Sequence, residues 1–186
     1  MQLHRGHGRS KTRGQSVAEL AIIAPVLLLL LMSVLQIGFL LFTQIGLTNA
    51  AREAARNAAA IPVATDAQAI VATTAYYARL TDASTGFLKR NVGGYNPSRL
   101  VTGTPGTKVC YYSFTDASGA PAVMARVEVE YSHPLFVPLI SNIIDGFDGT
   151  ADGGYRLGAT EDIRVGNAIL TAPSGIGDVG SPRCNP

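Results

Sequence analysis

The hydrophobic residues of this chain begin with one long uninterrupted run. Residues 20–51 contain no charged side chain, and residues 20–42 within them are apolar almost throughout. As a helix, these 23 residues would rise about 35 Å, compared with about 30 Å for the hydrocarbon core of a bilayer. A buried helix of a soluble domain is rarely so long and so uniformly apolar. The pattern therefore predicts a single membrane-spanning helix near the N-terminus.

The helical pattern continues beyond the apolar run, with a different composition. From residue 43 the chain becomes rich in alanine, the best helix former, and Pro62 is a typical stop. We expect a continuous helix over about residues 16–60, on the order of 65 Å long, that leaves the membrane as a stalk. Small residues allow helices to approach closely, so packing against other helices is one hypothesis for Ala51, Ala55 and Ala59. A simple spacer is the other.

The remaining residues alternate over short distances, which is typical of strands. Residues 122–131 alternate strictly, with Val, Ala, Val, Val and Tyr at the odd positions, which predicts a strand with one buried face. Residues 108–114 have strand composition, and the turn-like residues 115–121 join the two segments into a hairpin. The other predicted elements are a helix over 63–80, a loop over 86–106, a loop or short helix over 135–144 and a third strand over 155–165.

Together these elements predict an α+β fold in three parts. Residues 1–14 form a basic leader, residues 15–61 the transmembrane helix and stalk, and residues 62–186 a small exterior domain with an antiparallel sheet. The exterior part is long enough for one modest domain.

The charge of the chain is concentrated in the leader. Arg5, Arg9, Lys11 and Arg13 precede the apolar run, with no acid among them; removing these four leaves 11 basic residues against 13 acidic ones. An excess of Lys and Arg beside a span marks its cytoplasmic side. We therefore expect a single-pass protein with a cytoplasmic N-terminus and an exterior C-terminal domain. The leader has no interleaved aromatics, so we expect no nucleic-acid partner.

Two segments of the sequence carry a resemblance to a known family. Residues 13–26 read R-G-Q-S-V-A-E-L-A-I-I-A-P-V, and residues 48–56 read T-N-A-A-R-E-A-A-R. In pattern and spacing they resemble the TadE-like minor pseudopilins of the tight-adherence (Flp-type) pilus system. The order of motifs in the C-terminal half is also similar to the family, although more loosely.

This resemblance implies processing and a set of partners. A membrane prepilin peptidase would cut between Gly14 and Gln15, and Glu19 would be the glutamate at the fifth mature position that processing or assembly requires. The family usually has Phe or Tyr after this glutamate, where this chain has Leu20. The implied partners are the prepilin peptidase, the major pilin, other pseudopilins, the inner-membrane assembly platform and membrane lipid.

Other fates of the N-terminus remain open. An uncleaved signal anchor would make the chain a permanently anchored exterior binding or envelope protein. A secretory signal cleaved near Ala50 and Ala51 is disfavoured, because the apolar run exceeds the roughly 7–15 residues of a signal peptide and the helix continues past it.

Cys110 and Cys184 are the two cysteines of the chain. In an oxidising compartment they could pair and tie the C-terminal tail to the hairpin, and two free thiols are the alternative.

The sequence also contains patterns that mimic reactive sites. Residues 175–180 match G-x-G-x-x-G, but Pro173 precedes them and Ser181-Pro182 follows, where a dinucleotide site needs a strand and a helix. Asp145, Asp148 and Asp152 lack the spacing of an EF-hand. His133, Glu128 and Glu130 have no evident catalytic partner. We therefore expect neither an enzyme, a membrane-tethered hydrolase included, nor a metal or other cofactor.

Overall fold

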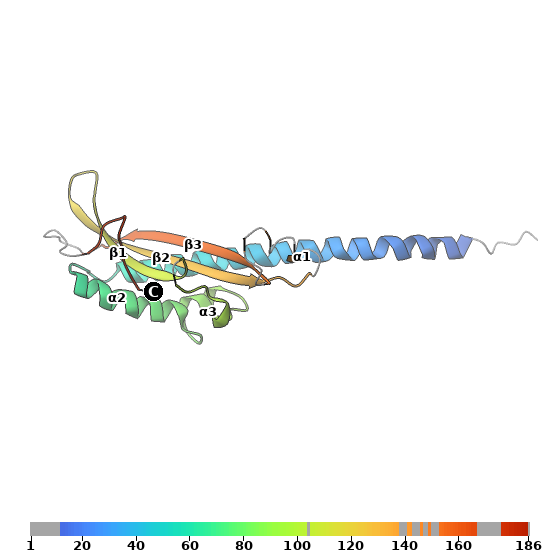
Figure 1. The fold of residues 1–186 in the computed structure, drawn as a ribbon, viewed down its shortest axis with the longest axis horizontal. Coiled ribbons are helices and arrows are strands. Elements are labelled where there is room, and N and C mark those ends of the chain that lie inside the picture. Colours follow the sequence, from blue (N-terminus) through green and yellow to red (C-terminus); the bar gives the residue numbers. More distant parts are fainter. Residues whose placement is uncertain are drawn as a thin grey trace, which may run out of the picture.

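The fold is built around one helix, α1, that is much longer than the domain it enters. The computed structural model describes residues 12–103, 105–137, 141–142, 146, 149, 153–166 and 176–185, with only the backbone for residues 12–14. One half of α1 projects as a rod, and the other half lies along a sheet (Figure 1). The helical elements are α1 (Thr12–Ala59), α2 (Asp66–Thr81), α3 (Phe87–Asn91) and the 3₁₀ turn η1 (Pro97–Arg99); the strands are β1 (Lys108–Thr115), β2 (Pro121–Pro134), β3 (Gly154–Arg164) and β4 (Arg183–Asn185).

The predicted α+β fold, with a long apolar N-terminal helix and an antiparallel sheet, is confirmed. α1 contains 48 residues and continues through Pro25, which gives it a length of about 70 Å. The sheet has the strand order β3-β2-β1-β4, and all neighbouring strands are antiparallel. β1, β2 and β3 are the three strands that the sequence predicted. β4, formed by the tail, was not predicted and lies at the edge of the sheet.

The hairpin of β1 and β2 is closed by a turn that its own residues define. Asp116 accepts hydrogen bonds from the backbone N–H groups of Ser118 and Ala120, at 2.9 and 3.0 Å. Gly119 has a φ of 81°, which glycine adopts without steric strain. The turn fixes the register, in which Val109 faces Val127.

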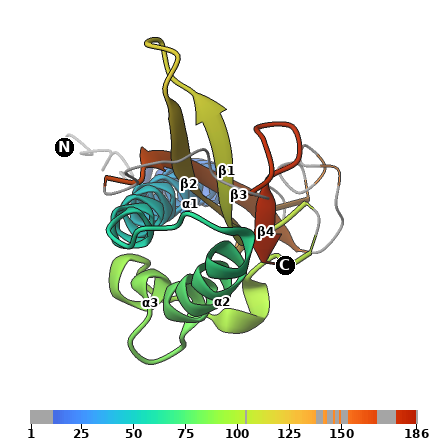
Figure 2. The ribbon, with the colours of Figure 1, turned by 90° about the vertical axis from the view of Figure 1, so that its left-hand side faces the viewer.

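Two helices cover one face of the sheet. α1 packs on β3 and β2, and α2 packs on β1 and β4, with α3 against both helices; the end-on view shows this arrangement (Figure 2). Because side chains alternate along a strand, the odd-numbered residues 123–131 of β2 point toward the helices and are buried. The hydroxyl of Tyr111 on β1 donates to the carbonyl of Ala58 on α1 at 2.8 Å.

The C-terminal half of α1, which the sequence predicted to be a stalk, is a core helix of the domain that contains the sheet. Ala51, Ala55 and Ala59 are buried in the same core cluster as the inner residues of β1 and β2. A Cβ atom on Gly46 would lie 2.5 Å from the carbonyl oxygen of Asn91, so glycine is what allows α3 to approach α1 this closely. These small residues therefore pack against their own chain.

The connection between α2 and β1 contains more structure than expected. The helix predicted over residues 63–80 is confirmed as α2, whose first turn is capped by Thr65. The loop predicted over residues 86–106 is wrong in part, because it contains α3 and η1. Phe87 and Leu88 of α3 are buried in the core cluster. Burial of this apolar pair stabilises a short helix that its composition alone does not predict.

Replacing Ala55 with leucine should destabilise the domain that contains the sheet, because Ala55 is fully buried and overpacking a core typically costs about 1–3 kcal/mol. Ala60, just past the end of α1, is exposed and provides a matched alanine-to-leucine control. Thermal unfolding of the full chain in detergent should show a lower midpoint for Ala55→Leu than for Ala60→Leu. Equal midpoints would show that this part of α1 does not pack on its own domain.

Candidate functional site: the bare half of α1 and its junction with the domain

Residues 15–35 of α1, which we call the bare half or bare rod, have apolar side chains on all sides of the helix. They make almost no contact with the rest of the described chain. Three consecutive leucines, which point in three directions around a helix, are each exposed: Leu28 by 56%, Leu29 by 39% and Leu30 by 60%. The helix Gln15–Ala59 is long and apolar enough to cross a membrane. Because residues 15–35 are largely exposed, the apolar run does not serve as a core helix of the domain that the structure describes.

The predicted processing residues lie at the free end of this bare half. The peptide bond between Gly14 and Gln15 lies in the first turn of α1, which begins at Thr12. The side-chain amide of Gln15 donates to Oε1 of Glu19 at 3.1 Å, one helical turn away. Both side chains are exposed. This end of α1 lies far from the sheet, which carries the predicted cysteine pair (Figure 1).

Gln36 is the first residue along α1 that the domain buries, and its side chain is fully buried. Its Oε1 accepts hydrogen bonds from the backbone N–H groups of Phe136 and Val137, at 3.3 and 3.0 Å. These two residues follow the end of β2, so their N–H groups lie beyond the strand ladder and need another acceptor. Gln36 is not among the residues predicted from the sequence, although it is the one amide side chain in the apolar run 20–42 and so could have been found.

The next turns of α1 add polar contacts to the sheet. Thr43 Oγ1 lies 3.1 Å from Nδ1 of His133 on β2, and the side-chain amide of Gln44 donates to the carbonyl of Gly158 on β3 at 2.7 Å. Burial lowers the pKa of His133, and the positive charge of Arg99 lowers it further. The contact of His133 with α1 therefore involves the neutral imidazole.

Ion pairs join α1 to two other elements, β3 and α3, and they come from residues 48–56. Arg52 pairs with Glu161 on β3 at 3.0 Å. Glu53 pairs with Arg90 on α3 at 2.8 Å and accepts from the side-chain amide of Asn91 at 2.9 Å. Exposed ion pairs contribute about 0–1 kcal/mol each, so their main effect here is on the orientation of the helix.

One comparison with known proteins found a match, and it lies in α1. Residues 14–56 match the family model described as TadE-like protein. This part of the chain is similar to that family. The match confirms the resemblance seen in the sequence and is consistent with a protein of the tight-adherence pilus system. No curated protein and no solved structure matches the chain.

The TadE-like segment coincides with most of α1. It begins at Gly14, includes the whole bare half, and ends at Arg56, next to the ion-paired residues Arg52 and Glu53. The sheet lies outside it. The family match thus covers both the apolar surface of α1 and the residues that form ion pairs between α1 and the sheet domain.

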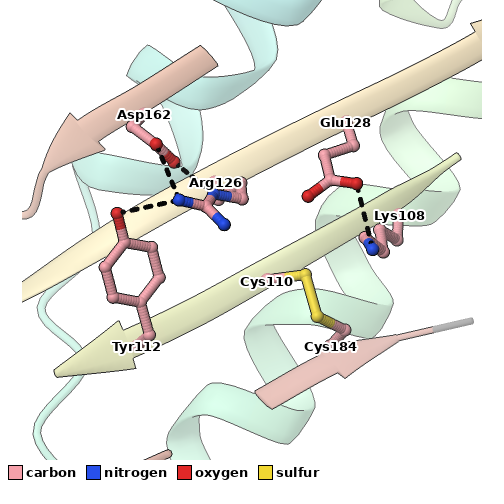
Figure 3. The surroundings of a disulfide bond; sticks show 7 residues. All are labelled: Lys108, Cys110, Tyr112, Arg126, Glu128, Asp162 and Cys184. Atoms are coloured by element: carbon pink, nitrogen blue, oxygen red, sulfur yellow. Dashed lines mark hydrogen bonds and ion pairs between the residues drawn. A yellow bond between two sulfur atoms is a disulfide. The ribbon is translucent and has the colours of Figure 1, made fainter. Parts of the chain in front are cut away.

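A disulfide joins the C-terminal tail to the sheet. Cys110 on β1 and Cys184 on β4 are paired across neighbouring strands, with a sequence separation of 74. The disulfide lies on the face of the sheet opposite the helices, in the same row as Arg126 and Asp162 (Figure 3). Next to Cys184, Arg183 makes two hydrogen bonds to Asp66 of α2, at 2.5 and 2.7 Å. The tail is thus fastened at both faces of the sheet.

The structure places some of the residues in the patterns that mimic reactive sites. Glu128 pairs with Lys108 at 3.0 Å on the outer face of the sheet (Figure 3). Residues 176–180 form irregular chain and a turn, and residue 175 lies outside the described residues, as do Asp145, Asp148 and Asp152.

The depressed pKa of His133 predicts how stability depends on pH. The unfolded chain takes up this proton near the ordinary histidine pKa of about 6.5, whereas the folded chain resists it, so stability should be lost as the pH falls below that value. The unfolding free energy of the wild type should decrease from neutral pH to mildly acidic pH. His133→Gln should lose this part of the decrease. A profile that is unchanged by the substitution would contradict the assignment.

Proposed function

We propose that this chain is a non-enzymatic minor pseudopilin that takes part in assembling a tight-adherence pilus. It is anchored in the cytoplasmic membrane by the bare half of α1, with its N-terminus in the cytoplasm and its sheet domain outside. A prepilin peptidase removes residues 1–14. The partners are the major pilin, other pseudopilins and the assembly platform in the inner membrane.

The proposal rests on one observation about α1. The part of this helix that matches the TadE-like family has a bare apolar half, and its other half is built into a folded domain. Apolar side chains that the domain leaves uncovered must be covered by something else, because about 25 cal/mol is gained for each Å² of apolar surface removed from water. Lipid provides this cover in the membrane, and apolar helices of neighbouring subunits could provide it in a fibre. A subunit that moves from the membrane into a fibre needs a helix that is apolar on all sides, because lipid covers it first and neighbouring helices cover it afterwards.

The charges at the cytoplasmic end support the orientation and the processing. The leader carries four basic residues, and basic residues close to a span remain on the cytoplasmic side. Gly14 lacks a side chain, so a protease can approach its backbone closely, and glycine weakens the first helical turn by about 1 kcal/mol relative to alanine. Cleavage would give Gln15 an ammonium group one turn from Glu19, with which it already shares a hydrogen bond.

A permanently anchored envelope or binding protein is the alternative function. An apolar groove of about 510 Å³ favours it, since the groove lies beside α2, at the end of the domain away from the bare rod. Ile61, Pro62, Val71 and Arg79 are among the residues that line the groove. Such a protein would keep its leader.

The mass of the mature protein distinguishes a processed pseudopilin from a permanently anchored protein. Expressed with a prepilin peptidase, the wild type should lose residues 1–14 and begin at Gln15, whereas Gly14→Val should remain full length in the membrane. Gly8→Val is the matched control, because it makes the same change in the same leader, and it should be cut normally. Intact mass and N-terminal sequencing of the purified proteins provide the measurement.

Two results would contradict the proposal. A wild-type chain that still begins at Met1 or Gln2 in its host would point to the permanent anchor. Cleavage of Gly14→Val at the same rate as the wild type would show that Gly14 is not the residue that the peptidase requires.

A further inference from the structure

Three phenylalanines gather where the bare half of α1 meets the exterior domain. Phe39 and Phe42 lie on α1 and are 53% and 60% exposed, and Phe136 follows the end of β2 and is 49% exposed. The rings of Phe39 and Phe136 meet edge to face, with their centroids 5.9 Å apart. An exposed aromatic cluster of this kind marks an interaction surface.

The distance along α1 from Glu19 to this cluster is close to the thickness of the hydrocarbon core of a bilayer. A hydrocarbon core of about 30 Å corresponds to about 20 residues of helix. Glu19 is the last charged residue before the apolar run, so the cytoplasmic boundary lies near it. Counted from Glu19, the opposite boundary falls near Phe39. The ring of Phe136 is therefore at the level where acyl chains meet headgroups.

We propose that the exterior domain rests directly on the outer surface of the membrane, with Phe136, Phe39 and Phe42 inserted at the boundary between headgroups and acyl chains. This inference depends on the membrane span of the proposed function. The occupant of the aromatic surface is lipid.

The hydrogen bonds of Gln36 explain how a loop can enter this region. Backbone N–H groups without partners are costly in a medium that contains little water. The Gln36 side chain accepts from the N–H groups of both Phe136 and Val137, so this part of the loop brings satisfied donors to the boundary. The Gln36 side chain is itself fully buried, and its Nε2 has no hydrogen-bond partner among the described residues.

A second loop reaches α1 at the same level. A Cβ atom on Gly93 would lie 2.8 Å from the ring of Phe42, so the chain after α3 passes directly over this ring. The domain therefore meets the boundary through two separate loops, which hold Gly93 and Phe136. Two such contacts would limit tilting of the domain relative to the bilayer.

The chain contains no tryptophan, so a single introduced tryptophan reports on one position. Full-length Phe136→Trp is reconstituted in vesicles of phosphatidylethanolamine and phosphatidylglycerol that contain lipids brominated either near the headgroup or deep in the acyl chains. Leu28→Trp, in the middle of the bare rod, is the control for the span, and Ile70→Trp, exposed on α2 and outside the lining of the apolar groove, is the control for the aqueous side.

The expected result is a crossing pattern of fluorescence quenching. Shallow bromines should quench the Phe136→Trp variant more than deep bromines do, and deep bromines should quench the Leu28→Trp variant more. Neither set of bromines should quench the Ile70→Trp variant. Iodide in the water should quench Ile70→Trp strongly and Phe136→Trp weakly.

Three outcomes would overturn the inference in distinguishable ways. If bromines quench Leu28→Trp but not Phe136→Trp, and iodide quenches Phe136→Trp freely, the domain stands clear of the membrane while the span holds. If the indole at position 136 is shielded from both quenchers, a neighbouring protein chain covers the cluster instead of lipid. If bromines quench neither Leu28→Trp nor Phe136→Trp, the membrane span itself fails, and the proposed function fails with it.

Discussion

The structure depends on the continuity of a single helix, α1, of which one half is uncovered and the other half is buried in the chain's own domain. Along residues 15–35 the side chains of α1 are exposed on nearly all sides, and from Gln36 onward one face is buried in the chain's own domain. Because the helix has no break at the junction, the orientation of the first half fixes the orientation of the second half and of the sheet that packs on it. Any force on the rod is therefore transmitted directly to the domain.

The change of surroundings along α1 agrees with its change of composition. Leucines lie where no part of the described chain covers the helix, and all sides of the helix are apolar there. Alanines and Gly46 replace them where the backbone of α1 must lie close to α3 and to the sheet, as the contact between Gly46 and Asn91 illustrates. Gln36 lies between the exposed half and the buried half of α1. It supplies the polar acceptor that the segment after β2 needs at the point where the domain first touches the helix.

The features that sequence could predict are those with a strong local pattern. The apolar run predicted the helix, and the alternation of Val123, Ala125 and Val127 predicted the buried face of β2. β4 contains three residues and depends on pairing with β1, so no local pattern reveals it. Alanine has little preference between a packed core and an exposed rod, and for this reason the sequence did not show that the stalk also packs on the sheet. The contacts of Gln36 and His133 join residues about 90 to 100 positions apart, and only the fold brings them together.

Hydrogen exchange of the full chain in vesicles tests the continuity of α1 most directly, because an unbroken helix protects every amide along its length. The account predicts slow exchange without interruption from the apolar run through residue 58, including the junction over residues 36–47. A group of rapidly exchanging amides within that junction would contradict it. Such a result would mean that the anchor and the domain are joined by a hinge, and that the domain is not oriented by the rod.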